Sequence, residues 1–378
     1  MTEQPAGVHV FTMDGDNFWD TEESDEWFFD SIARYEDLLM YDVHGLVSCA
    51  TFCNDSRLLL AVSRESRHEI WELGFPEKLI TRKDAGLIKN RDFNLLAAGF
   101  TECLAKQMLY VPSSVIISGS SGVLLYSLPQ SKSESDVMSL TKTLRSDVKD
   151  ASLALSSASV YSGASLSSIS RFDLNSCKIS EMPKVQNNTA NSSVWDSKDA
   201  ISDMSYVNEK LFICLRDKGN VLLYEPRVGT VVQEIAGSKK SEERWTMDVS
   251  CEGDTVAVAN SSGMLRVYDT RNYNEAVFMA RVKVEENTMR CHEIRISPTS
   301  SLVSVCGYDK NVHVYNFKTP EVNNGIIFSH DGHRGHNVQN IVTHLWHPSQ
   351  EKLLLSADNT GKLETWRFRQ SQSQNTTA

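Results

Sequence analysis

The segment VSVCGYDKNVHVY, residues 303–315, is typical of an apolar strand, a tight polar turn and a second strand that ends in an aromatic residue. Six further segments repeat this pattern: LLAVSRESRHEIW (59–71), VIISGSSGVLLY (115–126), YSGASLSSISRF (161–172), FICLRDKGNVLLY (212–224), VAVANSSGMLRVY (256–268) and LLLSADNTGKLETW (353–366). Their terminal aromatic residues lie 55, 46, 52, 44, 47 and 51 residues apart. This interval lies just above the ~40–45 residues of a four-stranded propeller blade, so the repeat predicts seven blades.

Seven such units predict an all-β fold, a seven-bladed β-propeller, because a closed ring leaves few strand edges exposed. The last copy ends at Trp366, and only a polar tail, residues 370–378, follows it after Phe368. That blade therefore lacks an outer strand within its own copy. Residues 38–43 precede the first blade and can supply this closing strand. The alternative is that they only continue a preceding helix.

One helix is predicted ahead of the propeller, over residues 25–39. Phe28, Ile32, Tyr35 and Leu39 lie at positions i, i+4, i+7 and i+11, the spacing of one helical face. The helix either packs against the edge of the propeller or is presented to a partner. We expect a single propeller over 24–369, an acidic flexible tail over 1–23, Ser-rich loops at 129–150 and 183–197, and a disordered tail over 370–378.

The composition excludes several classes of protein. Thirty-eight Lys and Arg against 49 Asp and Glu give the 378-residue chain a net charge of −11, which disfavours direct binding to nucleic acid. No apolar run is long enough to span a membrane. The first 33 residues contain no Lys or Arg, so neither a secretory signal nor a mitochondrial presequence fits. The eight Cys are spread along apolar segments, as reduced thiols of a cytosolic protein are.

Five histidines lie within 18 residues: His330, His333, His336, His344 and His347. This cluster has two interpretations. The spacing invites a zinc site, but the nearest Cys, Cys306, precedes the cluster by 24 residues, which favours a role in the repeat architecture instead.

The repeat interpretation rests on a short pattern in the last copy. Gly335-His336, Ser356 and Trp366 match the WD40 pattern, in which His, Ser or Thr, Asp and Trp form a buried hydrogen-bond chain. The Asp position, six residues before the aromatic residue, holds Thr360 in this copy and Asp309 in the sixth. No copy has the full set by this alignment, so we expect WD40-type repeats held mainly by apolar packing.

Catalytic motifs are missing from the sequence. It has no Gly-rich phosphate loop, no G-x-S-x-G and no H-E-x-x-H. Cys291 and His292 are adjacent on a predicted strand, so their side chains diverge. We therefore expect no enzyme and no cofactor, and a function exercised through contacts with other proteins.

Several stretches resemble the WD repeat-containing protein 73 family: Asp25-Glu26-Trp27 leading to Tyr41-Asp42, Gly86–Phe93 with Gly99-Phe100, Glu243-Arg244-Trp245, and Thr343–Pro348. The resemblance implies a cytoplasmic, non-enzymatic assembly factor. Such a factor binds and stabilises the Integrator RNA endonuclease heterodimer, subunits 9 and 11, and covers the catalytic subunit's active site before a HEAT-repeat assembly factor takes over. The resemblance also implies an alternative, a microtubule- or spindle-associated scaffold in cell division that binds tubulin. We expect a monomer before the complex forms.

The acidic charge suggests how such a partner is contacted. Our hypothesis is that acidic residues near the N-terminus, or the loop around Arg244 and Trp245, contact a basic RNA-binding channel by charge complementarity. The acidic residues are Asp14, Asp16, Asp20, Glu22 and Glu23. The alternatives are a free tail and a Trp245 that is buried at a blade edge.

Overall fold

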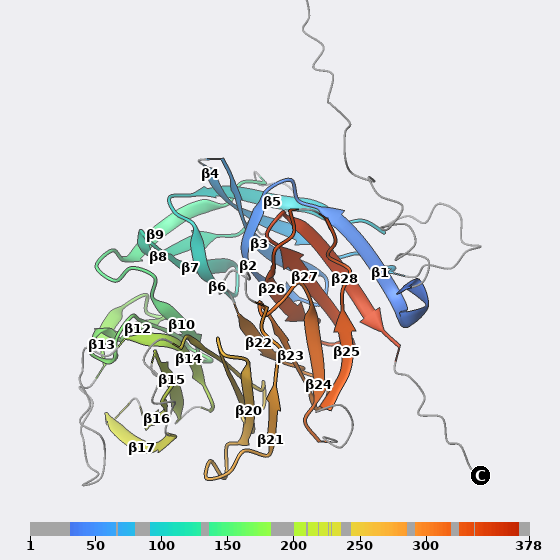
Figure 1. Ribbon diagram of the computed structural model, residues 1–378. Coiled ribbons are helices and arrows are strands. Elements are labelled where there is room, and N and C mark those ends of the chain that lie inside the picture. Colours follow the sequence, from blue (N-terminus) through green and yellow to red (C-terminus); the bar gives the residue numbers. More distant parts are fainter. Residues whose placement is uncertain are drawn as a thin grey trace, which may run out of the picture.

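The computed structural model shows seven four-stranded antiparallel sheets arranged in a ring, which confirms the seven-bladed propeller (Figure 1). It describes residues 31–65, 67–79, 91–129, 136–182, 200–208, 211–217, 219–225, 227, 229–235, 243–285, 292–318, 325–335 and 337–369. No helix in these ranges is long and apolar enough to cross a membrane.

Each blade is named by its strands, from the channel outward. Blade 1 is β2 (Leu46–Asn54), β3 (Arg57–Arg64), β4 (Arg67–Gly74) and β5 (Asn94–Thr101). Blade 2 is β6 (Ala105–Val111), β7 (Ser114–Gly119), β8 (Gly122–Ser127) and β9 (Ser139–Arg145). Blade 3 is β10 (Ser152–Leu155), β11 (Ser159–Gly163), β12 (Ser170–Asp173) and β13 (Ile179–Glu181). Blade 4 is β14 (Ile201–Tyr206), β15 (Phe212–Arg216), β16 (Val221–Glu225) and β17 (Thr230–Ile235).

Blade 5 is β18 (Trp245–Val249), β19 (Thr255–Asn260), β20 (Met264–Asp269) and β21 (Phe278–Arg281). Blade 6 is β22 (Glu293–Ile296), β23 (Leu302–Cys306), β24 (Val312–Asn316) and β25 (Ile326–His330). Blade 7 is β26 (Ile341–Trp346), β27 (Leu353–Asp358), β28 (Lys362–Phe368) and β1 (Tyr35–Asp42). Two short 3-10 helices, η1 (Ile32–Arg34) and η2 (Leu166–Ser168), complete the described elements.

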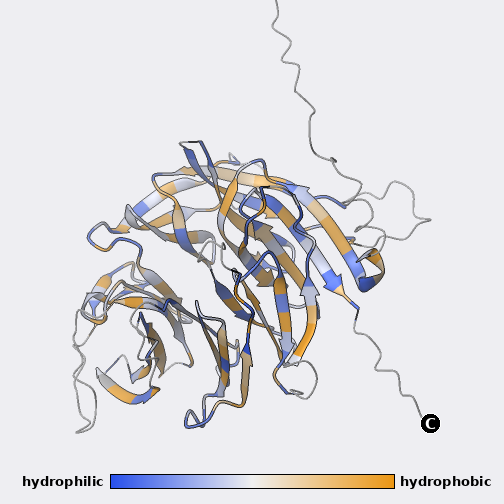
Figure 2. Cartoon of the chain, in the orientation of Figure 1, coloured by the Kyte–Doolittle hydropathy of each residue, from blue (hydrophilic) through white to orange (hydrophobic). Residues whose placement is uncertain are grey.

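The second strand of each blade is mostly apolar and buried, because neighbouring blades cover both of its faces. All five residues of β23 and all six of β27 are buried. Along the blades, apolar residues alternate with polar ones, and the turns are mostly hydrophilic (Figure 2).

The core consists of seven hydrophobic clusters, one at each junction between neighbouring blades. The cluster between blades 7 and 1 packs Leu355 and Leu363 against Leu60 and Val62. Because the last blade packs on the first in the same way as the others pack on one another, the ring is closed.

The outer strand of blade 7 comes from the other end of the chain. Strand β1 pairs antiparallel with β28, from Tyr35 opposite Phe368 to Asp42 opposite Lys362. The sequence places the closing strand at 38–43, and it begins three residues earlier, at Tyr35.

The predicted helix over 25–39 is wrong in its second half, since Tyr35 to Leu39 lie in β1. Side chains four residues apart share a face in a helix and also in a strand, so the spacing of Tyr35 and Leu39 does not distinguish the two. The exposed edge of β28 supplies hydrogen bonds to this backbone, and that tertiary pairing decides the outcome. Residues 25–30 lie outside the described residues.

The Ser-rich regions have different outcomes. The region 129–150, predicted to be a loop, contains β9, the outer strand of blade 2, which is a correction. The first five residues of β9 are exposed, so this outer strand tolerates polar residues and low hydrophobicity does not exclude a strand there. The region 183–197 and both predicted tails, 1–23 and 370–378, lie outside the described residues.

Candidate functional site

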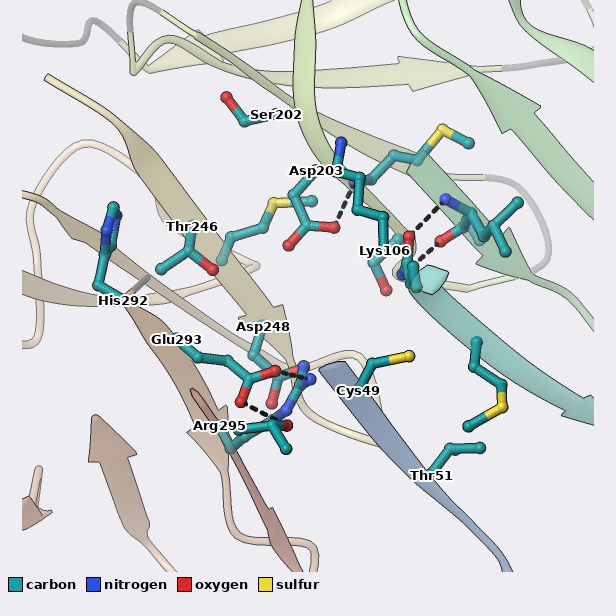
Figure 3. Close-up of a pocket in the computed structure, with 18 of the residues that line it drawn as sticks. Cys49, Thr51, Lys106, Ser202, Asp203, Thr246, Asp248, His292, Glu293 and Arg295 are labelled. Carbon is teal, nitrogen blue, oxygen red and sulfur yellow. Dashed lines mark hydrogen bonds and ion pairs between the residues drawn. The ribbon is translucent and has the colours of Figure 1, made fainter. Parts of the chain in front are cut away.

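The inner strands of the seven blades line a central channel with a cavity of about 900 Å³. Its wall takes side chains from β2, β6, β10, β14, β18, β22 and β26, so every blade contributes (Figure 3). A ring of inner strands brings together residues far apart in the sequence, such as Lys106 and Glu293.

Arg295 dominates the charge on one side of this channel. Its guanidinium donates to Glu293 Oε1, and the carboxylates of Glu293, Asp248 and Asp203 together raise the pKa of Arg295 although burial opposes this (Figure 3). Burial disfavours the charged form of Glu293, but Arg295 and His344 outweigh it and hold the pKa of Glu293 at about 2. We conclude that the Glu293–Arg295 pair is ionised.

The charged forms of Asp203 and Asp248 are less strongly stabilised than that of Glu293. Burial raises the pKa of Asp203 to about 6, against the opposing field of Arg295. Burial also raises the pKa of Asp248, whose Oδ2 accepts a hydrogen bond from the Ile296 amide at 2.6 Å. This side of the channel therefore carries more carboxylate than guanidinium.

Two nucleophile candidates face or adjoin the channel. Ser304 Oγ lies 2.7 Å from His344 Nε2, and His344 Nδ1 lies 3.5 Å from Glu293 Oε2, which has the order of a catalytic triad. Ser304 is 0 % exposed, so no substrate carbonyl reaches its hydroxyl. Burial raises the pKa of the Cys49 thiol in the channel wall to about 12, so it is not a nucleophile at neutral pH.

Of the dipeptide Cys291-His292, the structure describes His292, which lies in the wall of the channel. Burial lowers the pKa of His292 to about 4, so its ring is neutral. Cys291 lies outside the described residues.

The WD40 hydrogen-bond chain is complete in blade 7. Trp366 Nε1 donates to Ser356 Oγ at 3.1 Å, Ser356 Oγ lies 2.8 Å from His333 Nε2, and His333 Nδ1 lies 3.0 Å from Asp358 Oδ2. This corrects two assignments made from the sequence. The histidine is His333, three residues before His336, whose position is not among the described residues.

The acid of this chain is Asp358, two residues before the expected position. Thr360, which occupies the expected position, donates to Asp358 Oδ1 at 2.6 Å instead. The last copy therefore has the full set that the sequence alignment denies it. In the sixth copy, Asp309 contacts two residues of its own hairpin. Its Oδ1 accepts from the Asn311 amide at 2.8 Å, and its Oδ2 lies 2.8 Å from His313 Nε2.

Two other described histidines of the cluster, His330 and His347, serve packing within the ring. His330 stacks on Trp366 with 4.3 Å between ring centroids, and its Nε2 lies 3.0 Å from Glu364 Oε2. His347 Nε2 lies 3.0 Å from the Asp55 carbonyl oxygen, which joins blade 7 to blade 1. These contacts agree with the interpretation that the cluster belongs to the repeat architecture.

The residues predicted to contact a partner differ in where they lie. Asp14, Asp16, Asp20, Glu22 and Glu23 lie outside the described residues. Arg244 is exposed beside the channel, whereas Trp245 is 5 % exposed and its indole lies against Gly219, where a Cβ would come within 2.2 Å. Trp245 therefore packs inside the blade edge, as the alternative interpretation holds.

An exposed apolar patch lies on the outside of blade 1, and the sequence did not predict it. Phe100 is 67 % exposed, Val137 62 % and Leu95 56 %, and Val137 pairs with Ala98 between the other two. The register places Leu95, Ala98 and Phe100 on the face of β5 that carries Trp71 in β4, and Val137 lies beside Ala98. We call Leu95, Ala98, Phe100 and Val137 the blade 1 patch. Large exposed apolar side chains gathered along one strand are typical of interaction sites.

Gly99 makes this patch feasible, since a Cβ there would lie 2.7 Å from Met138. The sequence signal for the patch is therefore Gly99-Phe100, a small residue that admits a second segment and an aromatic residue with no buried role.

In sequence, the chain is similar to known proteins that share one name. No protein-family model matches it. It is 26% identical over 377 residues to the zebrafish (Danio rerio) "Integrator complex assembly factor WDR73", covering 92% of this chain and 96% of the relative. The mouse protein of that name is 24% identical, covering 91% and 98%, and the human one 25%, covering 90% and 97%. The resemblance inferred from the motifs is confirmed.

Proposed function

We propose that this chain is a non-enzymatic WD40-type scaffold that acts as an assembly factor for the Integrator complex. The observation that carries the proposal is similarity along nearly the whole of both chains to relatives with that name. A match over 96–98% of the relatives' length supports a shared propeller with a shared role, rather than one shared repeat. The fold alone would not support this, because propellers host many functions.

In its finer form, the proposal is that the chain binds and stabilises the RNA endonuclease heterodimer of subunits 9 and 11 in the cytoplasm. It covers the active site of the catalytic subunit until a HEAT-repeat factor replaces it. The net charge of −11 supports this, because an acidic surface suits a partner whose active site attracts RNA. The closed ring supports it as well, since a rigid ring presents loops and outer strands without changing shape.

Two surfaces are available for the partner. The blade 1 patch offers apolar area, and the exposed Arg244 lies at the rim of the channel. The acidic residues Asp14–Glu23 add a third candidate from the sequence. Buried aromatic anchors carry most of the energy of typical interfaces, so Phe100 is the first residue to test.

A reconstitution tests this proposal. The full chain is mixed with the purified heterodimer and resolved by size-exclusion chromatography, and cleavage of a model RNA is followed with and without the chain. We expect a stable complex and slowed cleavage. No co-elution, with cleavage unaffected, would contradict the proposal. Co-sedimentation of the same preparation with microtubules would favour the cytoskeletal alternative instead.

A further inference from the structure

Three side chains from blades 6 and 7 converge beside the channel: Glu293 of β22, Cys306 of β23 and His344 of β26. We propose that they form a binding site for a transition-metal ion, zinc above all, that is independent of the partner-binding function. One ligand atom from each residue lies within 4.8 Å of the other two. The sequence separates Cys306 from the histidines, and the pairing of neighbouring blades removes that separation.

The distances between these atoms suit one metal ion. His344 Nδ1 lies 3.2 Å from Cys306 Sγ and 3.5 Å from Glu293 Oε2. Zinc bonds of ~2.0–2.3 Å at tetrahedral angles place neighbouring ligand atoms about 3.4–3.6 Å apart. A shift of a few tenths of an ångström brings both distances from His344 Nδ1 into that range, and the third pair, the Cys306 thiol and the Glu293 carboxylate, lies within 4.8 Å.

The surroundings orient two of the three ligands, His344 and Glu293. His344 Nε2 bonds Ser304 Oγ at 2.7 Å, which leaves Nδ1 directed at the cluster. Glu293 Oε2 accepts from Thr343 Oγ1 at 3.0 Å and from the His344 amide at 2.9 Å. Such outer contacts are typical of metal ligands, since they fix the imidazole tautomer and the carboxylate.

Arg295 does not exclude a cation here. It donates to Glu293 Oε1, the carboxylate oxygen turned away from His344, so the carboxylate is shared between guanidinium and metal. Asp248 and Asp203 further offset the charge of Arg295.

A second cluster with metal-ligating residues, His330, His333 and Glu364, is a weaker candidate. Both ring nitrogens of His333 are already bonded, to Ser356 and Asp358, so a metal would have to break the WD40 chain. In the proposed site, by contrast, the partners of His344 Nδ1 are Cys306 and Glu293, the other two proposed ligands, so a metal would leave the bond to Ser304 in place.

The donor set determines the metal. A thiolate, an imidazole and a carboxylate suit zinc, whereas Mg²⁺ and Ca²⁺ require oxygen ligands throughout. Cys306 and His344 are fully buried, while Glu293 reaches the cavity, which leaves a fourth position for water from the channel side.

Metal content and cobalt spectra of the full chain test the site. We expect one zinc ion per chain after purification without chelators, and a thiolate-to-cobalt charge-transfer band when Co²⁺ replaces it. C306S and H344Q should lose the zinc and the band. C214S removes an equally buried thiol from the corresponding strand β15 of blade 4 and should keep both.

S304A gives a graded test, because it leaves all three ligands and removes only the bond to His344 Nε2. We expect metal affinity to fall about 10–100-fold. Absence of zinc and of the cobalt band in the native chain would overturn the site, even if C306S does not fold. Undiminished binding by folded C306S would overturn it as well.

Discussion

Tyr35 Oη lies 2.9 Å from His330 Nδ1, so the first described strand is bonded to the last strand of blade 6 across 295 residues of sequence. The same histidine stacks on Trp366, whose indole starts the WD40 chain. The closing strand is therefore joined to a continuous buried network as well as to the edge of β28.

Replacing Tyr35 by Phe should destabilise the propeller by about 1–3 kcal/mol, because it leaves His330 Nδ1 buried without its partner. Chemical denaturation followed by Trp fluorescence measures the change. Tyr41→Phe is the matched control on the same strand, since the Tyr41 ring packs on Phe93 in either form. Equal stability of Y35F and the native chain would show that the bond contributes nothing.

Replacing His333 by Ala should cost about 3–5 kcal/mol, because Asp358 would remain buried without its charged partner. His336→Ala should cost much less, since His333 already fills the place in the chain that the motif assigns to His336. Thermal unfolding of the two variants side by side makes the comparison. A larger loss in H336A would restore the original assignment.

The same network predicts a pH dependence. Burial alone would lower the pKa of His333, but the carboxylates of Glu364 and Asp358 outweigh burial and raise it above 6.5. The folded state thus binds the proton more tightly than the unfolded state, and this stabilisation is complete below about pH 6.5. It is lost as the pH rises through the raised pKa.

The test compares the free energy of unfolding of the native chain with that of His333→Gln between about pH 6 and pH 9. The advantage of the native chain should shrink as the pH rises. His330, whose pKa is lowered by burial, and Asp358, whose pKa is lowered by His333 against the effect of burial, titrate at more acidic pH than the range compared. An advantage that grows with pH would contradict the assignment of a charged His333.

Replacing Phe100 by Ser should leave stability nearly unchanged, because the ring is 67 % exposed. If the blade 1 patch contacts the partner, affinity for the heterodimer should fall by about 10-fold or more, which corresponds to the loss of one anchor of about 1.4 kcal/mol. Biolayer interferometry measures the affinity, with Met279→Ser on the outer strand of blade 5 as an equally exposed control. Equal losses in both variants would remove the patch from the interface.

The number of blades could be predicted because each blade repeats its own local pattern of strand, turn and aromatic residue. Even the Ser-rich third copy follows it, from β11 to Phe172 in β12. The closing strand could be predicted only in part. Tyr35–Asp42 forms a strand because β28 offers an edge to pair with, and that edge lies 320 residues or more away in sequence.

The residues of the site were harder to predict from the sequence, for the same reason. Gly332-His333 and Gly335-His336 are equivalent dipeptides in the sequence, and only the position of Asp358 and Ser356 selects the first. Cys306 lies far from His344 along the chain, yet adjacent blades bring their side chains to 3.2 Å. Long-range packing decides which histidine joins the WD40 chain and which cysteine meets His344. A local sequence pattern carries no information on that packing.

The most direct test of the central claim is affinity purification of the tagged full chain from cytosol, with quantitative mass spectrometry of the partners. The account predicts Integrator subunits 9 and 11 in amounts close to that of the chain itself. Recovery of tubulin in their place, or of no partner in comparable amount, would contradict it.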